Sequence, residues 1–87
     1  MSKNWNFTKR DKAQPIEFDG GADEICKGCT VNLEQDGVGI IVQVNSGKGH
    51  TWTGEITGFD NDETTVGELK IGTKIQFEDN HVFRCAA

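Results

Sequence analysis

The sequence predicts a mainly β domain, built as a small antiparallel sheet or a partly closed barrel of five to seven short strands. Apolar and polar residues alternate with a period of two in several short segments, which is typical of half-buried strands. Eleven glycines occur among 87 residues, and this density suits tightly bent strands and barrel corners. At most one short helical turn is expected, near residues 22–28.

The first fifteen residues are polar and basic, and they are expected to form an N-terminal arm rather than part of the domain. This arm is either partly disordered or contributes an edge strand at residues 4–8, where the polar and apolar side chains alternate. Pro15 is expected to end the arm. Residues 16–87 then form a single small β domain, beginning with a brief extended piece at residues 16–18.

The clearest strand signals are at residues 30–35 and 38–44. Asp36 and Gly37 separate them and predict a hairpin turn, because glycine accepts a positive φ without steric cost. The second segment is the most apolar run in the chain, which predicts a central strand. Its expected inward-facing residues are Val38, Ile40, Val42 and Val44.

A turn at residues 45–49 and a strand at residues 50–59 are expected next, and Gly58-Phe59 breaks the alternation as a bulge would. Asp79-Asn80 fits a two-residue hairpin turn near the C-terminus. Because short turns join each pair, an antiparallel meander is the simplest topology. Further strands are expected at residues 66–71, 74–78 and 81–85.

The charge is unevenly distributed along the chain. The net charge is −5, with a balance of +3 over residues 1–15 and −8 over residues 16–87, which hold five basic and thirteen acidic residues. An acidic body repels phosphate backbones, so nucleic acid is disfavoured as a ligand and a basic protein is the expected partner.

Neither a signal peptide nor a membrane span is apparent in the sequence. The first ten residues are polar, with no apolar h-region behind them, and no apolar run approaches the ~20 residues of a membrane-spanning helix. Three cysteines, an odd number, argue against a secreted disulfide framework. The expected compartment is the cytoplasm.

Cysteine and histidine residues form the one motif with metal-binding chemistry. Cys26 and Cys29 have the spacing of half a zinc site, and His81 and Cys85 could supply the other two ligands. In an extended strand, however, His81 and Cys85 would lie roughly 13 Å apart, too far for one zinc ion. The alternative is a buried Cys85 and a polar His81 beside a turn. A redox role for Cys26 and Cys29 has less support, because the βαβ context of such motifs is missing.

Two further segments are candidate binding sites. His50 and Trp52 follow a glycine-rich turn, which either forms a small ligand site or is an ordinary hairpin turn; an exposed Trp52 would be a natural interface anchor. Asp60, Asp62 and Glu63 begin like a calcium loop but lack its glycine and distal glutamate. They are expected to form a solvated acidic loop that could face a basic partner.

No arrangement of residues supports catalysis, and a core this thin disfavours a deep cleft. The favoured hypothesis is a non-enzymatic interaction module that binds a basic partner through an edge strand and an acidic face, or pairs with a second copy. Its size and charge would suit a phage- or prophage-type modulator. The alternative is a small β-barrel that binds nucleic acid, or a structural zinc-binding domain; apart from zinc, no cofactor is expected.

Overall fold

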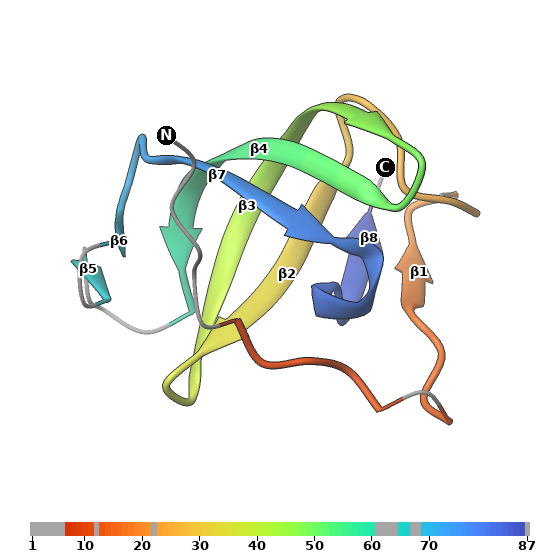
Figure 1. Cartoon of the computed structure of the whole chain (residues 1–87), viewed down its shortest axis with the longest axis horizontal. Helices are drawn as coiled ribbons and strands as arrows, with labels where there is room; N and C mark the ends of the chain where they lie inside the picture. The colour runs from red at the N-terminus through yellow and green to blue at the C-terminus, as the bar shows by residue number, and fades with distance from the viewer. Residues whose placement is uncertain (1–6, 12, 22, 61–64, 67–68, 87) are drawn as a thin grey trace.

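Strands make up nearly all the regular structure of the chain (Figure 1). The computed structural model describes residues 7–11, 13–21, 23–60, 65–66 and 69–86. Within these ranges the only helical segment is a 3-10 turn, η1, so the predicted mainly β class is confirmed. The elements are β1 (Glu17–Asp19), β2 (Thr30–Gln35), β3 (Val38–Lys48), β4 (Thr51–Phe59), β5 (Thr65–Val66), β6 (Leu69–Lys70), β7 (Lys74–Glu78), η1 (Asp79–His81) and β8 (Arg84–Ala86).

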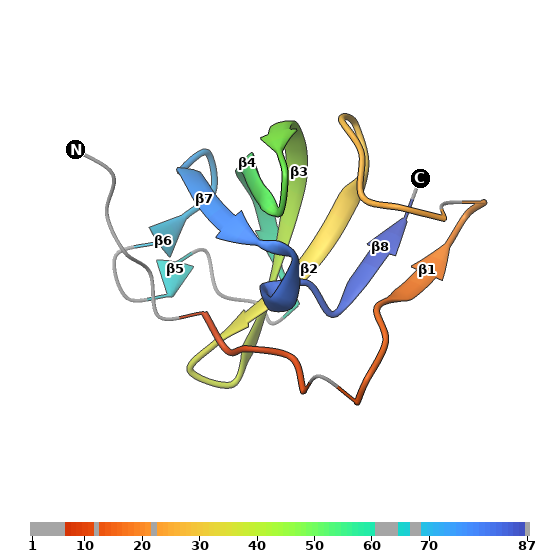
Figure 2. The same cartoon turned by 45° about the vertical axis from the view of Figure 1, so that its right-hand side comes forward.

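Six strands form one open sheet in the order β1-β8-β2-β3-β4-β7, while β5 and β6 make a separate two-stranded ribbon. Figure 2 shows the six strands side by side, with β7 at one edge and β1 at the other. All neighbours in the sheet are antiparallel except β1 and β8, which run parallel. The sheet is therefore mixed, and the expectation of a purely antiparallel sheet is wrong at this one pair.

The β2–β3 hairpin matches its prediction. Leu33 pairs with Ile40, and the register continues to Gln35 opposite Val38. Between these strands Asp36 and Gly37 have φ values of 54° and 79°. Two successive positive φ angles define a type I′ turn, whose twist matches that of the flanking strands.

Strand β3 is longer than predicted and continues to Lys48. The expected turn at residues 45–49 is wrong, because Ser46, Gly47 and Lys48 remain paired with β4. A register shift between Val44 and Ser46 accommodates the extra residue, and the chain reverses instead at residues 49–50.

A second register shift confirms the bulge predicted near the end of β4. Ile41 pairs with Gly58 and Val42 with Ile56, so one residue of β4 is left over. A bulge changes which side chains face inward beyond it. As a result, Ile56 and Phe59 are both buried although they are three positions apart.

The predicted hairpin at Asp79-Asn80 is wrong, and the meander ends there. These residues belong to η1, which is closed by a capping box in which the Glu78 N–H donates to Nδ1 of His81 at 3.0 Å. This turn directs the chain across the open side of the sheet, so β8 does not return beside β7. It lies instead between β2 and β1.

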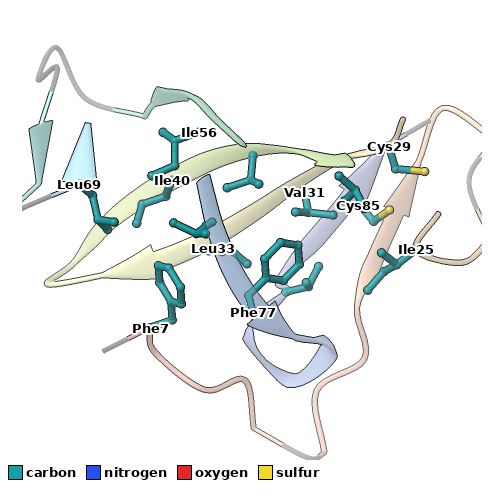
Figure 3. Packing of buried hydrophobic residues seen from close by; sticks show 14 of the residues in the cluster. Phe7, Ile25, Cys29, Val31, Leu33, Ile40, Ile56, Leu69, Phe77 and Cys85 are labelled. Carbon is teal, nitrogen blue, oxygen red and sulfur yellow. The ribbon is translucent and has the colours of Figure 1, made fainter. Parts of the chain in front are cut away.

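The inward-facing side chains of the sheet form one core (Figure 3). Predicted inward positions on β2, β3 and β7 are buried, and Val38 packs against the core from its margin. Ile25 and Val82 add to it from outside the strands. The buried apolar side chains are Phe7, Ile25, Cys29, Val31, Leu33, Ile40, Val42, Val44, Ile56, Phe59, Leu69, Ile75, Phe77, Val82 and Cys85.

The described part of the arm packs against the domain. Phe7 is 6% exposed, and the Thr8 N–H donates to the Glu34 carbonyl at 2.7 Å. Arg10 donates from its backbone to the Asn80 carbonyl, and its guanidinium donates to the carbonyls of Asp79, the first residue of η1, and Val82, which follows η1. The edge strand predicted at residues 4–8 falls mostly outside the described residues, and Phe7 and Thr8 lie in no strand.

Two smaller predictions concern residues 22–28, where at most one helical turn was expected, and residues 66–71. The described part of residues 22–28 contains no helical turn; its chain reverses at residues 26–29, where Gly28 has a φ of 90° that a helix excludes. Of the strand expected at residues 66–71, Val66 belongs to β5, Leu69 and Lys70 form β6, and Ile71 lies in a turn; residues 67–68 lie outside the described residues. No helix in the described residues is long and apolar enough to cross a membrane.

Candidate functional site

The free edge of β1 combines a partly exposed aromatic side chain with backbone groups that point away from the sheet. The Glu17 N–H donates to the Phe83 carbonyl at 3.1 Å, so the backbone of Glu17 faces β8. Backbone groups of successive strand residues point to opposite sides. The N–H and C=O of Phe18 therefore point outward, and no loop hydrogen bond in the described residues reaches them.

Phe18 lies at this edge and is an exposed apolar residue, not one of those packed against the core. Phe18 pairs with Cys85 of β8, which in turn pairs with Val31 of β2. Cys85 and Val31 are fully buried, whereas Phe18 is 38% exposed, and β1 is the edge strand of the sheet that the described residues form. An aromatic ring in this position can bury further area against an added chain.

Acidic residues lie on both sides of Phe18 in the sequence. Glu17 and Asp19 precede and follow it, and Asp23 and Glu24 lie in the next loop. Asp19 forms an ion pair with Arg84, the one ion pair among the described residues at this edge. We call Phe18 with its four acidic neighbours the β1 edge. Its charge favours positively charged ligands.

The three cysteines meet beside this edge. Cys26 and Cys29 lie at the ends of a tight turn, with the Cys29 N–H donating to the Cys26 carbonyl at 3.1 Å and their sulfur atoms 2.6 Å apart. Cys26 is exposed, and Cys29 and Cys85 are buried. Figure 3 shows the latter two at the end of the core nearest β1. Burial, with the neighbouring Cys29 thiol, raises the pKa of Cys85 to about 12.

His81, the remaining predicted zinc ligand, makes its contacts away from the three cysteines. His81 closes η1, where its Nδ1 accepts the Glu78 N–H, and its ring packs edge-on against Phe7. Burial lowers the pKa of His81, which favours the neutral imidazole that this hydrogen bond requires. Among the described side chains, no group of three or more His, Cys, Asp or Glu residues is arranged to hold a metal ion.

The other predicted binding residues do not converge on one site. His50 is exposed and its Nδ1 lies 2.8 Å from Oδ2 of Asp79. Trp52 is half-buried; its ring occupies the space above Gly47 that a Cβ would fill, and its buried Nε1 has no partner in the described residues. Asp60 accepts the Gly39 N–H at 3.0 Å and so braces β3 against the end of β4. Asp62 and Glu63 lie outside the described residues.

A shallow hollow of about 440 Å³ lies over β3, β4 and β7. Neither His50 nor Trp52 lines it, so the ligand site considered around these two residues is not the hollow. Its lining side chains are short hydroxyls and one amide, on a face that is open to solvent. The lining residues are Ser46, Gly47, Thr51, Thr53 and Gln76.

Comparison with protein-family models, with curated proteins and with solved structures gives no match. The candidate site therefore rests on the geometry of the β1 edge. Phe18 was not among the candidate residues from the sequence. The sequence held no signal that would single it out, because a phenylalanine between two acidic residues is the ordinary alternation of a half-buried strand.

Proposed function

We propose that this protein is a non-enzymatic interaction module, which binds an extended segment of a basic protein partner at the β1 edge. The observation that supports this most directly is Phe18, a residue that is 38% exposed at the free edge of an open sheet. An incoming strand would hydrogen-bond to its outward N–H and C=O and cover its ring.

The surrounding charge indicates what the partner carries. Glu17, Asp23 and Glu24 are exposed, and the arginine at this edge is already paired with Asp19. Lysine or arginine side chains flanking the added strand would be attracted to these carboxylates. A second copy of the chain would bring the same carboxylates together and be repelled, which favours a basic partner over a homodimer.

A defined probe tests the proposal. A peptide of alternating lysine and valine can present both an apolar face to Phe18 and positive charges to the carboxylates. Titrated into isotope-labelled protein at low salt, it should shift the amide resonances of Glu17, Phe18, Asp19 and the β8 residues. A peptide of alternating glutamate and valine should shift none of them. Equal shifts with both peptides, or shifts confined to other strands, would contradict the proposal.

Two substitutions at one position separate strand addition from mere hydrophobic contact. Phe18→Pro removes the outward N–H, which an edge strand tolerates, whereas Phe18→Ala removes the ring and keeps the N–H. Strand addition predicts measurable binding of the lysine–valine peptide to the alanine variant and none to the proline variant. Ile71→Ala, at the other large apolar residue that is exposed in the described part of the chain, is the matched control and should bind like the wild type.

Salt and charge provide an independent check. Surface attraction between peptide and carboxylates weakens as the Debye length falls from roughly 10 Å at 0.1 M salt to 3 Å at 1 M. Changing Glu17 and Glu24 to glutamine and Asp23 to asparagine should have the same effect at low salt. If the affinity for the peptide changed neither with salt nor with these substitutions, the proposal that the partner is basic would be contradicted.

A further inference from the structure

The turn that carries Cys26 and Cys29 places two thiols of different exposure in contact. Gly28, at its third position, has a φ of 90°, as type II turns require. Hydrogen bonds hold the turn to β3, from the Gly28 N–H to the Val44 carbonyl at 2.8 Å and from the Val44 N–H to the Cys29 carbonyl at 2.9 Å. The turn is thus fixed to the sheet.

Such a turn can accommodate a disulfide without moving the backbone. The first and fourth Cα atoms of a β-turn are less than about 7 Å apart, and disulfides span Cα separations of about 4.4–6.8 Å. The sulfur atoms of Cys26 and Cys29 are already in contact, at 2.6 Å, as free thiols. Only the exposed Cys26 is open to a reagent from solvent.

We propose that Cys26 and Cys29 are a redox-active dithiol, which is oxidised by low-molecular-weight disulfides while Cys85 stays reduced. The Cys26 thiolate attacks one sulfur of the reagent, forming a mixed disulfide and releasing one thiol. Cys29 then loses its proton to solvent and attacks the Cys26 sulfur, which releases the second thiol. Two protein S–H bonds are replaced by one S–S bond, and the reagent disulfide is reduced to two thiols.

The electrostatic surroundings affect the rate and the direction of this exchange. The pKa of Cys26 is raised, first by its hydrogen bond to the Cys29 thiol and also by the nearby carboxylates of Glu24 and Asp23. Little thiolate is therefore present at neutral pH, and exchange is slow. The reduced form also lacks the thiolate stabilisation that makes some dithiols strong oxidants, so the disulfide persists once it has formed.

Cys85 could form a disulfide with Cys29 in place of Cys26, so the linked residues must be identified. Its thiol lies next to Cys29 and donates to the Glu24 carbonyl at 3.8 Å. It is fully buried on β8, so a reagent cannot reach it directly. If Cys29 formed a disulfide with Cys85 instead, the oxidised protein would still carry Cys26 as a free thiol.

The test is incubation of the full chain with excess glutathione disulfide at mildly alkaline pH, followed by alkylation of the remaining thiols and mass mapping. The proposal predicts a monomer that has lost two hydrogens, a Cys26–Cys29 link, alkylation only at Cys85 after unfolding, and full reversal by dithiothreitol. Cys85→Ala should form the same link. Cys26→Ser should form no internal disulfide.

Three results would overturn the proposal. One is a Cys29–Cys85 link in the wild type; another is an internal disulfide in Cys26→Ser at the wild-type rate. The third is a wild-type chain that remains fully reduced, or carries only glutathione on Cys26, after prolonged incubation. Circular dichroism of each variant before oxidation verifies that it is folded. If Cys85→Ala is unstable, the wild type can still be compared with Cys26→Ser, because Cys26 is exposed and its substitution should not disturb the fold.

Discussion

Replacing Phe7 with alanine tests whether the N-terminal arm is part of the folded domain. The Phe7 ring is 6% exposed and packs against His81, with ring centroids 5.7 Å apart. Truncation of a buried phenylalanine to alanine costs about 3–5 kcal/mol. Because Phe7 lies at the margin of the core and outside any strand, we expect the lower end of that range. The unfolding free energy of a domain of this size is roughly 4–13 kcal/mol, so the loss is a large share of it.

Thermal and urea unfolding, followed by circular dichroism, measure this effect. In a domain of this size each kcal/mol shifts the Tm by about 4–8 °C, so Phe7→Ala should lower it by about 12–24 °C. Phe18→Ala is the matched control: Phe18 is 38% exposed, and the loss of its ring should cost at most about 1 kcal/mol. If both variants melted within about 4 °C of each other, the packing of the arm against the domain would be refuted.

Three further predictions concern pH, packing and thiol reactivity. Burial lowers the pKa of His81 below its usual 6.5, so between the two pKa values the unfolded chain binds more protons than the folded one. The free energy of unfolding is therefore unaffected by His81 above pH 6.5 and decreases as the pH falls below 6.5. Urea unfolding at several pH values should show this loss in the wild type and not in His81→Gln. An added Cβ at Gly54 would lie 2.6 Å from the Gln43 carbonyl oxygen, whereas at Gly58 its nearest neighbour is 3.8 Å away. Urea titration should therefore show a cost of about 1–3 kcal/mol for Gly54→Ala and little change for Gly58→Ala; equal costs would contradict this packing. The raised pKa of Cys26 predicts that its alkylation by iodoacetamide still accelerates above the usual thiol pKa, and that Glu24→Gln is alkylated faster at neutral pH; an early plateau, or no effect of Glu24→Gln, would contradict it.

Local patterns in the sequence were sufficient to predict much of the sheet. Alternation predicted β2 and β7, and Asp36-Gly37 predicted the hairpin turn, because in each case the signal lies within a few consecutive residues. The extension of β3 through Ser46 and Gly47 was not predicted, since these residues are typical of turns. Their pairing depends on a register shift and on the Trp52 ring above Gly47, which are properties of two strands together.

Contacts between distant segments could not be predicted in this way. The position of β8 between β1 and β2 depends on the path that the chain takes after η1, and that path depends on a hydrogen bond between Glu78 and His81. The same turn holds His81 in place as a cap. Strand geometry had already argued against a zinc ion shared by His81 and Cys85; the structure separates their roles because His81 belongs to η1 and not to an extended strand.

The candidate site was predicted only in outline. An edge strand and an acidic face were expected, but the sequence did not indicate which strand would be the edge. Phe18 becomes important only because β1 lies beside β8 and no other strand among the described residues pairs with its outer side. The nearness of Cys85 to Cys29 likewise arises from the pairing of β8 with β2, which joins segments far apart in the chain.

Amide hydrogen exchange at Phe18 is the most direct measurement of strand addition at the β1 edge. In the free protein the Phe18 N–H points outward and should exchange quickly, while the Glu17 N–H, bonded to the Phe83 carbonyl, should be protected. Adding the lysine–valine peptide at low salt should slow exchange at Phe18 and leave Glu17 unchanged. An amide at Phe18 that exchanges equally fast with and without the peptide would contradict the proposed function.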